Sequence, residues 1–214
     1  MALTTTVGAA DPGPSLKTTH TSTDDATIRF DQPRHGQVDG IGPFPGSAIA
    51  WIGVGSNIHS PLGRCRRAIA LLAQNHQIRL LALSSWYHTQ PVGFKHQPWF
   101  INAVACLATS LLPLALLRLL QRVECRLGRN RRREFKNGPR PMDLDLLMYD
   151  QCQLHHPRLT LPHPRITRRR FVLVPLAELS PTLLHPGCGK TIDLLLKETD
   201  DKSRVEPMAP PGWR

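Results

Sequence analysis

The segment PMDLDLLMYD, residues 141–150, carries two aspartates, Asp143 and Asp145, among residues that are typical of a buried strand. Side chains two residues apart on a strand point to the same side, about 6 to 7 Å apart, so both carboxylates face one surface. The methionine and leucines beside them face the opposite side and pack on a core. The sequence therefore predicts a strand with one acidic face and one core face.

The elements before this strand alternate in type. AIAWIGVG, residues 48–55, has a strand pattern and precedes a helix whose N-cap is predicted to be Ser60. Residues 78–89 and 99–109 are two further strand candidates, and a second helix over 111–127 has its apolar residues on one stripe. The order βαββαβ predicts an α+β, ferredoxin-like core with helices on one face of an antiparallel sheet, plus C-terminal additions.

The chain divides into three parts by composition. Residues 1–46 are rich in Thr, Pro, Gly and Asp and lack hydrophobic periodicity, which predicts a disordered N-terminal extension rather than a signal or transit sequence. Residues 47–197 hold the periodic segments and predict one domain, and residues 198–214 predict a flexible C-terminal tail. No apolar run approaches the roughly 18 residues of a membrane span, so we expect a cytoplasmic protein without a membrane partner.

Charge and cysteine usage indicate the kind of partner and compartment. The formal net charge of +11 favours an anionic partner, which could be nucleic acid, a membrane surface or a phosphorylated small molecule. Composition alone does not choose among these. The five cysteines are scattered and form no C-x-x-C pair, which indicates neither a disulfide framework nor a zinc site and favours a reducing compartment.

Two glycine-rich stretches resemble nucleotide-binding motifs without matching them. HPGCGKT, residues 185–191, ends like a phosphate-binding loop, but Leu184 stands where its first glycine would be. GVGSN, residues 53–57, lacks the third glycine of a dinucleotide fingerprint because Ile58 stands there. We interpret the first as a simple turn and the second as a tight strand-to-helix turn.

The two aspartates are candidate metal ligands. Carboxylates that lie this close repel one another unless cations neutralise them, and Mg²⁺ does so while keeping water and phosphate oxygens as its other ligands. This predicts a platform for a metal-bound nucleotide. The alternative is a solvated strand face whose aspartates pair with arginines.

A strongly basic segment comes just before the aspartates. It contains a single acid, Glu134, and the residues Asn137, Gly138 and Pro139, which indicate a loop that could close over a polyphosphate. The alternatives are a solvated face and a nucleic-acid patch. Its basic residues are Arg126, Arg129, Arg131, Arg132, Arg133, Lys136 and Arg140.

Several motifs in order carry a resemblance to a family. They are VGSN, S-x-x-Y-x-T-x-P-V-G from 84 to 93, QPWFINAV from 97 to 104, GPRPMDLDLL, and LTLPHPRITRRRFVLVPLAEL. Together, over about residues 50 to 196, they resemble 6-hydroxymethyl-7,8-dihydropterin pyrophosphokinase of folate biosynthesis. The pattern GPR-x-x-DLD with a downstream PH is the most specific of them.

The resemblance implies an enzyme, a pyrophosphokinase, that transfers pyrophosphate from ATP to the hydroxymethyl oxygen of the pterin and leaves AMP. It assigns two Mg²⁺ ions to Asp143 and Asp145, with ATP as co-substrate. Attack on the β-phosphorus needs charge neutralisation and alignment rather than a protein nucleophile, which agrees with paired carboxylates beside arginines. We expect a monomer with ATP and the pterin as its partners and with no nucleic acid.

The resemblance also implies roles for individual residues. Catalytic roles fall on Arg131, Arg140, Asp143, Asp145 and His163. ATP contacts fall on Gln121, Glu124, Leu146, Arg158, Thr160 and Arg169. Pterin contacts fall on Thr89, Val92, Phe100, Asn102 and Phe171, of which the two phenylalanines suit stacking on a flat heterocycle and Asn102 suits reading its polar edge.

The sequence departs from the family in the basic loop, which is one residue longer than usual and has Asn137 where a tryptophan is common. Two other functional classes fit parts of the pattern. A basic ferredoxin-like domain could bind RNA, but the strands lack the aromatic signature of an RNA-recognition motif. A two-metal nucleotidyltransferase or cyclase would also use paired strand aspartates, but it would release pyrophosphate rather than AMP.

Overall fold

The computed structural model describes residues 46–131, 133–135 and 137–209. The predicted N-terminal extension therefore lies outside the described residues, apart from Gly46. The strands are β1 (Ala48–Ser56), β2 (Ile78–Leu83), β3 (Tyr87–Thr89), β4 (Phe100–Thr109), β5 (Asp143–Tyr149), β6 (Leu154–His156), β7 (Leu159–Leu161) and β8 (Val205–Pro207). The helices are α1 (Pro61–Ala73), α2 (Pro113–Arg126), α3 (Arg170–Leu179) and α4 (Ile192–Glu198), with a short 3₁₀ turn at Ile166–Arg168.

Six strands form one antiparallel sheet in the order β5-β1-β4-β3-β8, with β2 also paired to β4. Strands β6 and β7 form a separate two-stranded sheet. The predicted class, helices combined with an antiparallel sheet, is confirmed. The predicted single strand over 78–89 is two strands, because the chain bends between them where Ser84 bonds Val104 through both its backbone and its hydroxyl.

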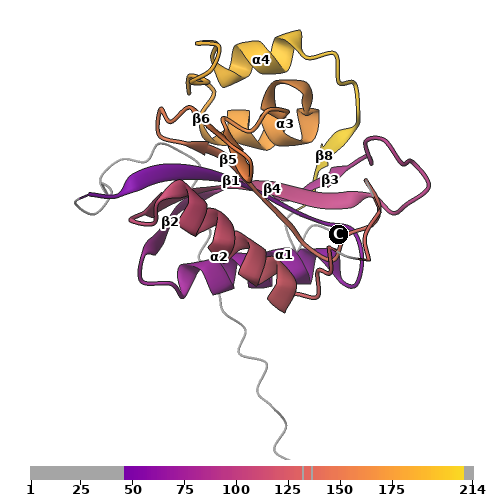
Figure 1. The fold of residues 1–214 in the computed structure, drawn as a ribbon. Coiled ribbons are helices and arrows are strands. Elements are labelled where there is room, and N and C mark those ends of the chain that lie inside the picture. Colours follow the sequence, from indigo (N-terminus) through magenta and orange to yellow (C-terminus); the bar gives the residue numbers. More distant parts are fainter. Residues whose placement is uncertain (1–45, 132, 136, 210–214) are drawn as a thin grey trace, which may run out of the picture. The chain divides into compact units, whose positions relative to one another are not determined.

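Helices cover both faces of the sheet (Figure 1). On one face, α1 and α2 pack on Ala50, Ile52 and Val54 of β1 in a large apolar cluster. On the other face, α3 and α4 pack around Trp51 and Leu147 in a second cluster. The expectation of helices on one face holds for α1 and α2 but is incomplete, because the C-terminal additions supply two helices that bury the opposite face.

Helix α1 begins at Pro61, whose fixed φ suits the first helical position. Ser60 occupies the predicted N-cap position, and its carbonyl accepts the N–H of Arg64. Its side chain bonds no helix amide, and its backbone is left-handed, with φ of 62°. The predicted stripe of α2 is confirmed, since Leu116, Leu120 and Val123 are all buried.

The glycines of GVGSN lie within strand β1 and not in a turn, which corrects the interpretation made from the sequence. Gly53 pairs with Asp145 of β5, and Gly55 pairs with Asp143 on that side and with Asn102 of β4 on the other. A Cβ atom on Gly55 would lie 2.4 Å from the Oδ1 atom of Asn102. The glycine is therefore required by the close approach of a side chain. The turn predicted for 185–191 is confirmed, with His185 donating to the carbonyl of Lys190.

Regular structure continues after residue 197, where the sequence predicted a flexible tail. Helix α4 ends at Glu198, and residues 205–207 form β8, an edge strand that pairs with β3. Composition did not predict this strand because a strand of three residues is too short to show hydrophobic periodicity. Its position is set by its pairing with β3. The region predicted as a flexible tail therefore contains a paired strand, and residues 210–214 lie outside the described part of the chain.

The described residues contain no disulfide and no membrane-spanning helix. The cysteines are free thiols, and Cys65 and Cys106 are buried among apolar side chains. Burial raises the pKa of both thiols to about 12. Within the described ranges, none of the helices has the length and apolar character needed to cross a bilayer.

We expect Leu120→Ala to lower the free energy of unfolding by about 2 to 5 kcal/mol, because it removes a fully buried side chain and leaves a cavity between α2 and the sheet. Leu112→Ala is the matched control, since this leucine is 74% exposed at the start of the same helix. Its effect should stay within about 0.5 kcal/mol. Urea unfolding of both variants checks this, and equal losses would contradict the assigned packing.

Candidate active site

The two aspartates of β5 point to the same side of the sheet, as predicted. Leu144 and Leu146, which alternate with them, are buried against the α1 and α2 layer. Asp143 and Asp145 lie on the face that α3 and α4 cover only in part, and both are half-buried. Because the residues opposite them on β1 are glycines, β1 itself places no side chain beside the two carboxylates, and the carboxamide of Asn102 reaches over Gly55.

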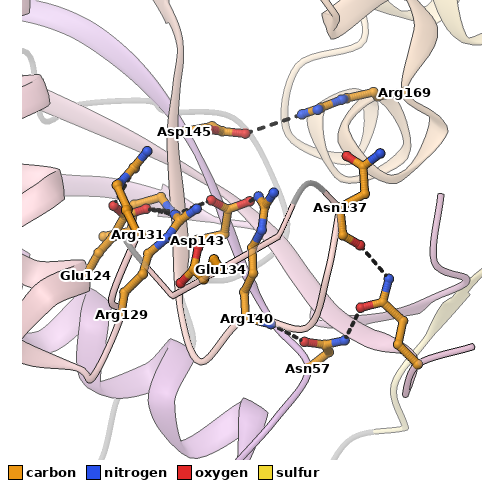
Figure 2. Close-up of polar contacts among 12 residues, drawn as sticks. Asn57, Glu124, Arg129, Arg131, Glu134, Asn137, Arg140, Asp143, Asp145 and Arg169 are labelled. Atoms are coloured by element: carbon orange, nitrogen blue, oxygen red, sulfur yellow. Dashed lines mark hydrogen bonds and ion pairs between the residues drawn. The ribbon is translucent and has the colours of Figure 1, made fainter. Parts of the chain in front are cut away.

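Two arginines hold Asp143. Arg129 donates to one carboxylate oxygen at 2.5 Å, and Arg140 donates to the other at 2.7 Å (Figure 2). Burial alone would raise the pKa of Asp143, but the two guanidinium groups outweigh it and hold the pKa below its usual value. Asp143 is therefore a carboxylate at neutral pH.

The buried acid Glu124 ties this cluster to helix α2. Its carboxylate accepts the backbone N–H of Leu144 at 2.8 Å and a guanidinium N–H of Arg131 at 2.7 Å. It also accepts from Arg129, which bonds Glu134 at 3.2 Å as well. Helix α2, strand β5 and the basic loop are thereby joined by one chain of alternating charges (Figure 2).

Arg129 was not singled out by sequence reasoning, although its side chain is only 5% exposed. The sequence of α2 nevertheless indicates that a buried cation is needed nearby. Glu124 lies four residues after Leu120, on the buried stripe, and a buried carboxylate requires a cationic partner. Gly128, with φ of 91°, ends the helix and turns the chain back so that Arg129 reaches that acid.

Asp145 pairs with a different arginine. Arg169, which immediately precedes α3, donates to its carboxylate at 3.3 Å. The guanidinium carbon of Arg169 lies 5.3 Å from the ring centroid of Phe171. The start of α3 thus brings one cation and one aromatic ring to the acidic face.

Two cavities meet at Asp145. A small one of about 20 Å³ is lined by the two aspartates together with Asn102 and Phe171. An open one of about 310 Å³ is lined by Asp145 and by polar and basic residues of α2, the basic loop and the β6–β7 region. A compact group and an elongated anionic group could therefore bind on either side of the same carboxylate.

The sequence matches, over residues 51–181, the model of the family described as 7,8-dihydro-6-hydroxymethylpterin-pyrophosphokinase (HPPK). The chain belongs to the HPPK family. It is 43% identical over 161 residues to the 2-amino-4-hydroxy-6-hydroxymethyldihydropteridine pyrophosphokinase of Synechocystis sp., which covers 75% of this chain and 80% of the relative. It is 39% identical over 138 residues to the folic acid synthesis protein of Schizosaccharomyces pombe, which covers 64% of this chain and 19% of that protein.

The fold is similar to that of Plasmodium falciparum HPPK-DHPS in its crystal structure with pteroate, with a TM-score of 0.57 and 13% sequence identity. The similar region covers 71% of this chain and 44% of that longer one, so this chain spans less than half of that structure. At this identity the likeness concerns the fold alone. It agrees with the family assignment from sequence.

The residues expected to contact ATP gather at the open cavity of this HPPK-family chain. Glu124 lies buried beneath the cavity and holds Arg131, and Arg169 approaches it through Asp145. Arg140 pairs with Asp143 instead of lining the cavity. The expected residues that line it are Gln121, Arg131, Asp145, Leu146, Arg158, Thr160 and His163.

The residues expected to contact the pterin are brought together only in part. Asn102 and Phe171 line the small cavity, and Asn102 donates to the hydroxyl of Thr89 at 2.5 Å. Phe100 pairs with Thr89 across the sheet but is not among the lining residues. Val92 is 51% exposed and lines neither cavity.

Asn57 is a second residue that sequence reasoning left without a role. Its carboxamide accepts the backbone N–H of Arg140 at 2.7 Å and donates to Gln97 at 3.0 Å. Gln97 in turn donates to the backbone carbonyl of Asn137 at 2.8 Å. These bonds, drawn in Figure 2, link the basic loop to the loop before β4. The asparagine of VGSN was quoted as part of a motif, but only the folded chain shows what it joins.

The proton of His163 can be placed from its contacts. Nδ1 accepts the backbone N–H of Arg165 at 3.2 Å, so the neutral ring carries its proton on Nε2. Burial lowers the pKa of His163 below its usual value, and Arg169 lowers it further while Asp145 opposes the shift. At neutral pH this side chain is therefore a neutral hydrogen-bond donor at the wall of the open cavity.

The donor set of the site fits magnesium. Among the described residues, His, Cys, Asp and Glu side chains do not gather in groups of three that could hold a metal ion. Asp143 and Asp145 are two hard oxygen donors on one face, and a metal ion held by them would take its remaining ligands from water and phosphate oxygens. Mg²⁺ favours such incomplete sites, whereas zinc sites use three or four protein ligands.

We expect the pKa of His163, measured by NMR from the ring Hε1 signal, to lie below 6.5 in the folded protein. A group whose folded pKa is depressed stabilises the fold above its unfolded pKa, so this contribution is lost as the pH falls below about 6.5. His163→Gln assigns the signal, and the urea-unfolded chain supplies the reference. A folded midpoint at or above the unfolded one would contradict the assigned burial.

Proposed function

We propose that this chain catalyses the Mg²⁺-dependent transfer of pyrophosphate from ATP to 6-hydroxymethyl-7,8-dihydropterin, giving AMP and the pterin diphosphate. Membership of the HPPK family indicates pyrophosphoryl transfer in folate biosynthesis. The observation that carries the proposal is the meeting of two cavities at Asp145, one with an amide and an aromatic ring and one with basic residues. An acceptor and a polyphosphate would meet at that carboxylate.

The small cavity suits the pterin. Phe171 offers a flat apolar face, which favours stacking on a heterocycle. The carboxamide of Asn102 is oriented by its bond to Thr89, so its free oxygen can accept from an amino or ring N–H group. The cavity is too small for a heterocycle as it stands. We therefore propose that the site widens on binding through movement of the loop between β3 and β4, which carries Val92. Phe100 lies at the root of that loop and would contribute once it has moved.

The open cavity suits ATP. Arg131 is 57% exposed and reaches the cavity from the basic loop, while Arg158 and Thr160 face it from β7 and the turn before it. Guanidinium groups bind phosphate oxygens through paired hydrogen bonds, which hold a phosphate chain in one orientation. Gln121 and the apolar side chain of Leu146 border the same space and would contact the nucleoside.

The chain's own residues can align and stabilise the transfer. Asp143 and Asp145 would hold Mg²⁺, two ions by our proposal, which supply charge neutralisation and activation of the attacking hydroxyl group. Arg140 and Arg169 each hold one of these carboxylates and could exchange it for a phosphate oxygen. His163 would donate its Nε2 proton in a hydrogen bond to an oxygen on which charge develops.

We further infer the finer features of the fold and setting. The path β1-α1-β2-β4-α2-β5 with strand order β5-β1-β4-β2 supports the ferredoxin-like core. We propose a pyrophosphokinase domain that begins at about residue 47, extends past the predicted end at 197 to include β8, and acts as a cytoplasmic monomer. The anionic ATP would account for the basic charge without a nucleic-acid or membrane partner.

The product distinguishes this function from the other classes. A two-metal nucleotidyltransferase would release pyrophosphate, and an RNA-binding module would convert neither substrate. Chromatography of the reaction of purified protein with Mg²⁺, ATP and the pterin would give AMP in a 1:1 ratio to pterin diphosphate under our proposal. Pyrophosphate in place of AMP would contradict it.

We expect Asp143→Ala and Asp145→Ala each to lower kcat by more than about a hundredfold, because each removes an oxygen ligand of the ions that align the phosphates. Asp193→Ala is a suitable control, since Asp193 pairs with Lys197 at 2.6 Å on the surface of α4, outside both cavities. Circular dichroism establishes that the variants fold. Near-normal AMP formation by either site variant would sink the metal assignment.

We expect residues 1–46 to be dispensable for the chemistry, because every residue placed in the site lies beyond them. They hold five acidic and three basic residues, so their removal raises the formal charge from +11 to +13. AMP formation by residues 47–214 and by the full chain should agree within about twofold at low and moderate ionic strength. A several-fold loss of kcat on truncation would show that these residues contribute to catalysis.

A further inference from the structure

The C-terminal segment, residues 199–208, contacts one element that lines the small cavity, α3, and one that supports a lining residue, β3. It follows α4 and lies outside the family match, which ends at residue 181. One end of the segment bonds the start of α3, which carries Phe171. The other end forms β8 beside β3, which carries Thr89 (Figure 1). The two elements are far apart in sequence, and this segment bridges them.

The first contact is a helix cap from a distant residue. Asp201 accepts the backbone N–H of Arg170, the first residue of α3, through Oδ2 at 2.8 Å. Its Oδ1 atom accepts the N–H of Ser203 at 2.9 Å, which orients the carboxylate. The residue at the N-cap position, Arg169, makes no capping bond with its own side chain. Asp201 therefore satisfies a helix amide and places a negative charge at the positive end of α3.

This cap bears directly on the site because of the residues beside Arg170. Arg169 pairs with Asp145, and Phe171 lines the small cavity. A change in the first turn of α3 would therefore move the arginine and the ring together.

The second contact is with β3, which supports the cavity-lining residue Asn102. Val205 pairs with Thr89, whose hydroxyl accepts from Asn102. The carbonyl of Arg204 accepts the N–H of Gln90 at 2.9 Å, and its guanidinium carbon lies 5.3 Å from the ring centroid of Trp99. Both ends of the loop between β3 and β4 are thus held by the same short segment.

We propose that the C-terminal segment positions the acceptor side of the site, with Asp201 as a positioning residue that fixes Phe171 relative to Thr89 and Asn102. The proposal rests on the function proposed above and adds a determinant of pterin affinity. Asp201 touches no substrate. It acts through α3, so its loss should weaken acceptor binding more than the chemical step.

Asp201→Ala tests this, with Asp200→Ala as the matched control. Asp200 is adjacent, carries the same charge, is exposed, and has no partner among the described residues. We expect Asp201→Ala to raise the KM for 6-hydroxymethyl-7,8-dihydropterin by about three- to tenfold, the effect of losing a helix cap. The kcat at saturating pterin should change by less than about twofold, and Asp200→Ala should match the unaltered chain. The KM for ATP should change less, because α2, β5 and β7 line most of the open cavity.

Hydrogen exchange gives a readout that does not depend on catalysis. In Asp201→Ala without substrates, the amides of residues 170–173 should exchange faster than in Asp200→Ala, because the cap is lost. Asp201→Asn keeps one neutral acceptor and should fall between the two in both measurements.

Two results would overturn the proposal. One is an unchanged pterin KM in Asp201→Ala, including the case in which kcat and Tm fall together, which would indicate a purely structural role. The other is an equal rise in pterin KM in Asp200→Ala, which would indicate a general charge effect. AMP formation by the unaltered chain tests the underlying function separately, because its absence would overturn that function whatever Asp201 does.

Discussion

The ion pairs around Asp143 hold together the parts of the molecule on which its chemistry depends. Arg129 lies between Glu124 and Asp143, and Arg140 completes the pairing of Asp143. Charges removed from water are costly unless each has a partner, so such a group is stable only as a set. Loss of one member would leave the buried charges beside it with fewer partners. The positions of β5, α2 and the basic loop are therefore fixed by the same few contacts.

The arginines of this cluster differ in side-chain exposure, which indicates different roles. The side chain of Arg129 is 5% exposed and that of Arg131 is 57% exposed, although both bond Glu124. A buried guanidinium with three carboxylate partners is committed to the fold. An exposed one that has one carboxylate partner among the described residues can turn to a phosphate at little cost. Arg140 is intermediate at 25%. The basic loop thus supplies both the support of Asp143, the carboxylate proposed to hold metal, and the cations that would meet ATP.

The features that sequence reasoning predicted are those with a local signal. Alternating residues in β5 and the stripe of α2 show which side of each element is buried, and the ordered motifs identified the family. The features that it missed depend on long-range pairing. Arg129 is one of many arginines in its segment, and only the end of α2 directs it to Glu124. The strand β8 exists because β3 is beside it, so its three residues carry no pattern that could reveal it.

The acidic face also depends on two positions of β1 that carry no side chain, Gly53 and Gly55. Gly55 lies between Asp143 and Asn102 in three adjacent strands, and the carboxamide of Asn102 occupies the space that a Cβ on Gly55 would need. Gly53 is less constrained, since a Cβ there would lie 3.7 Å from that of Asp145, an ordinary contact. The need for glycine at 55 therefore arises from the side chain that crosses it. A larger residue would push Asn102 away from Thr89, and the small cavity would lose the group that can recognise the polar edge of an acceptor.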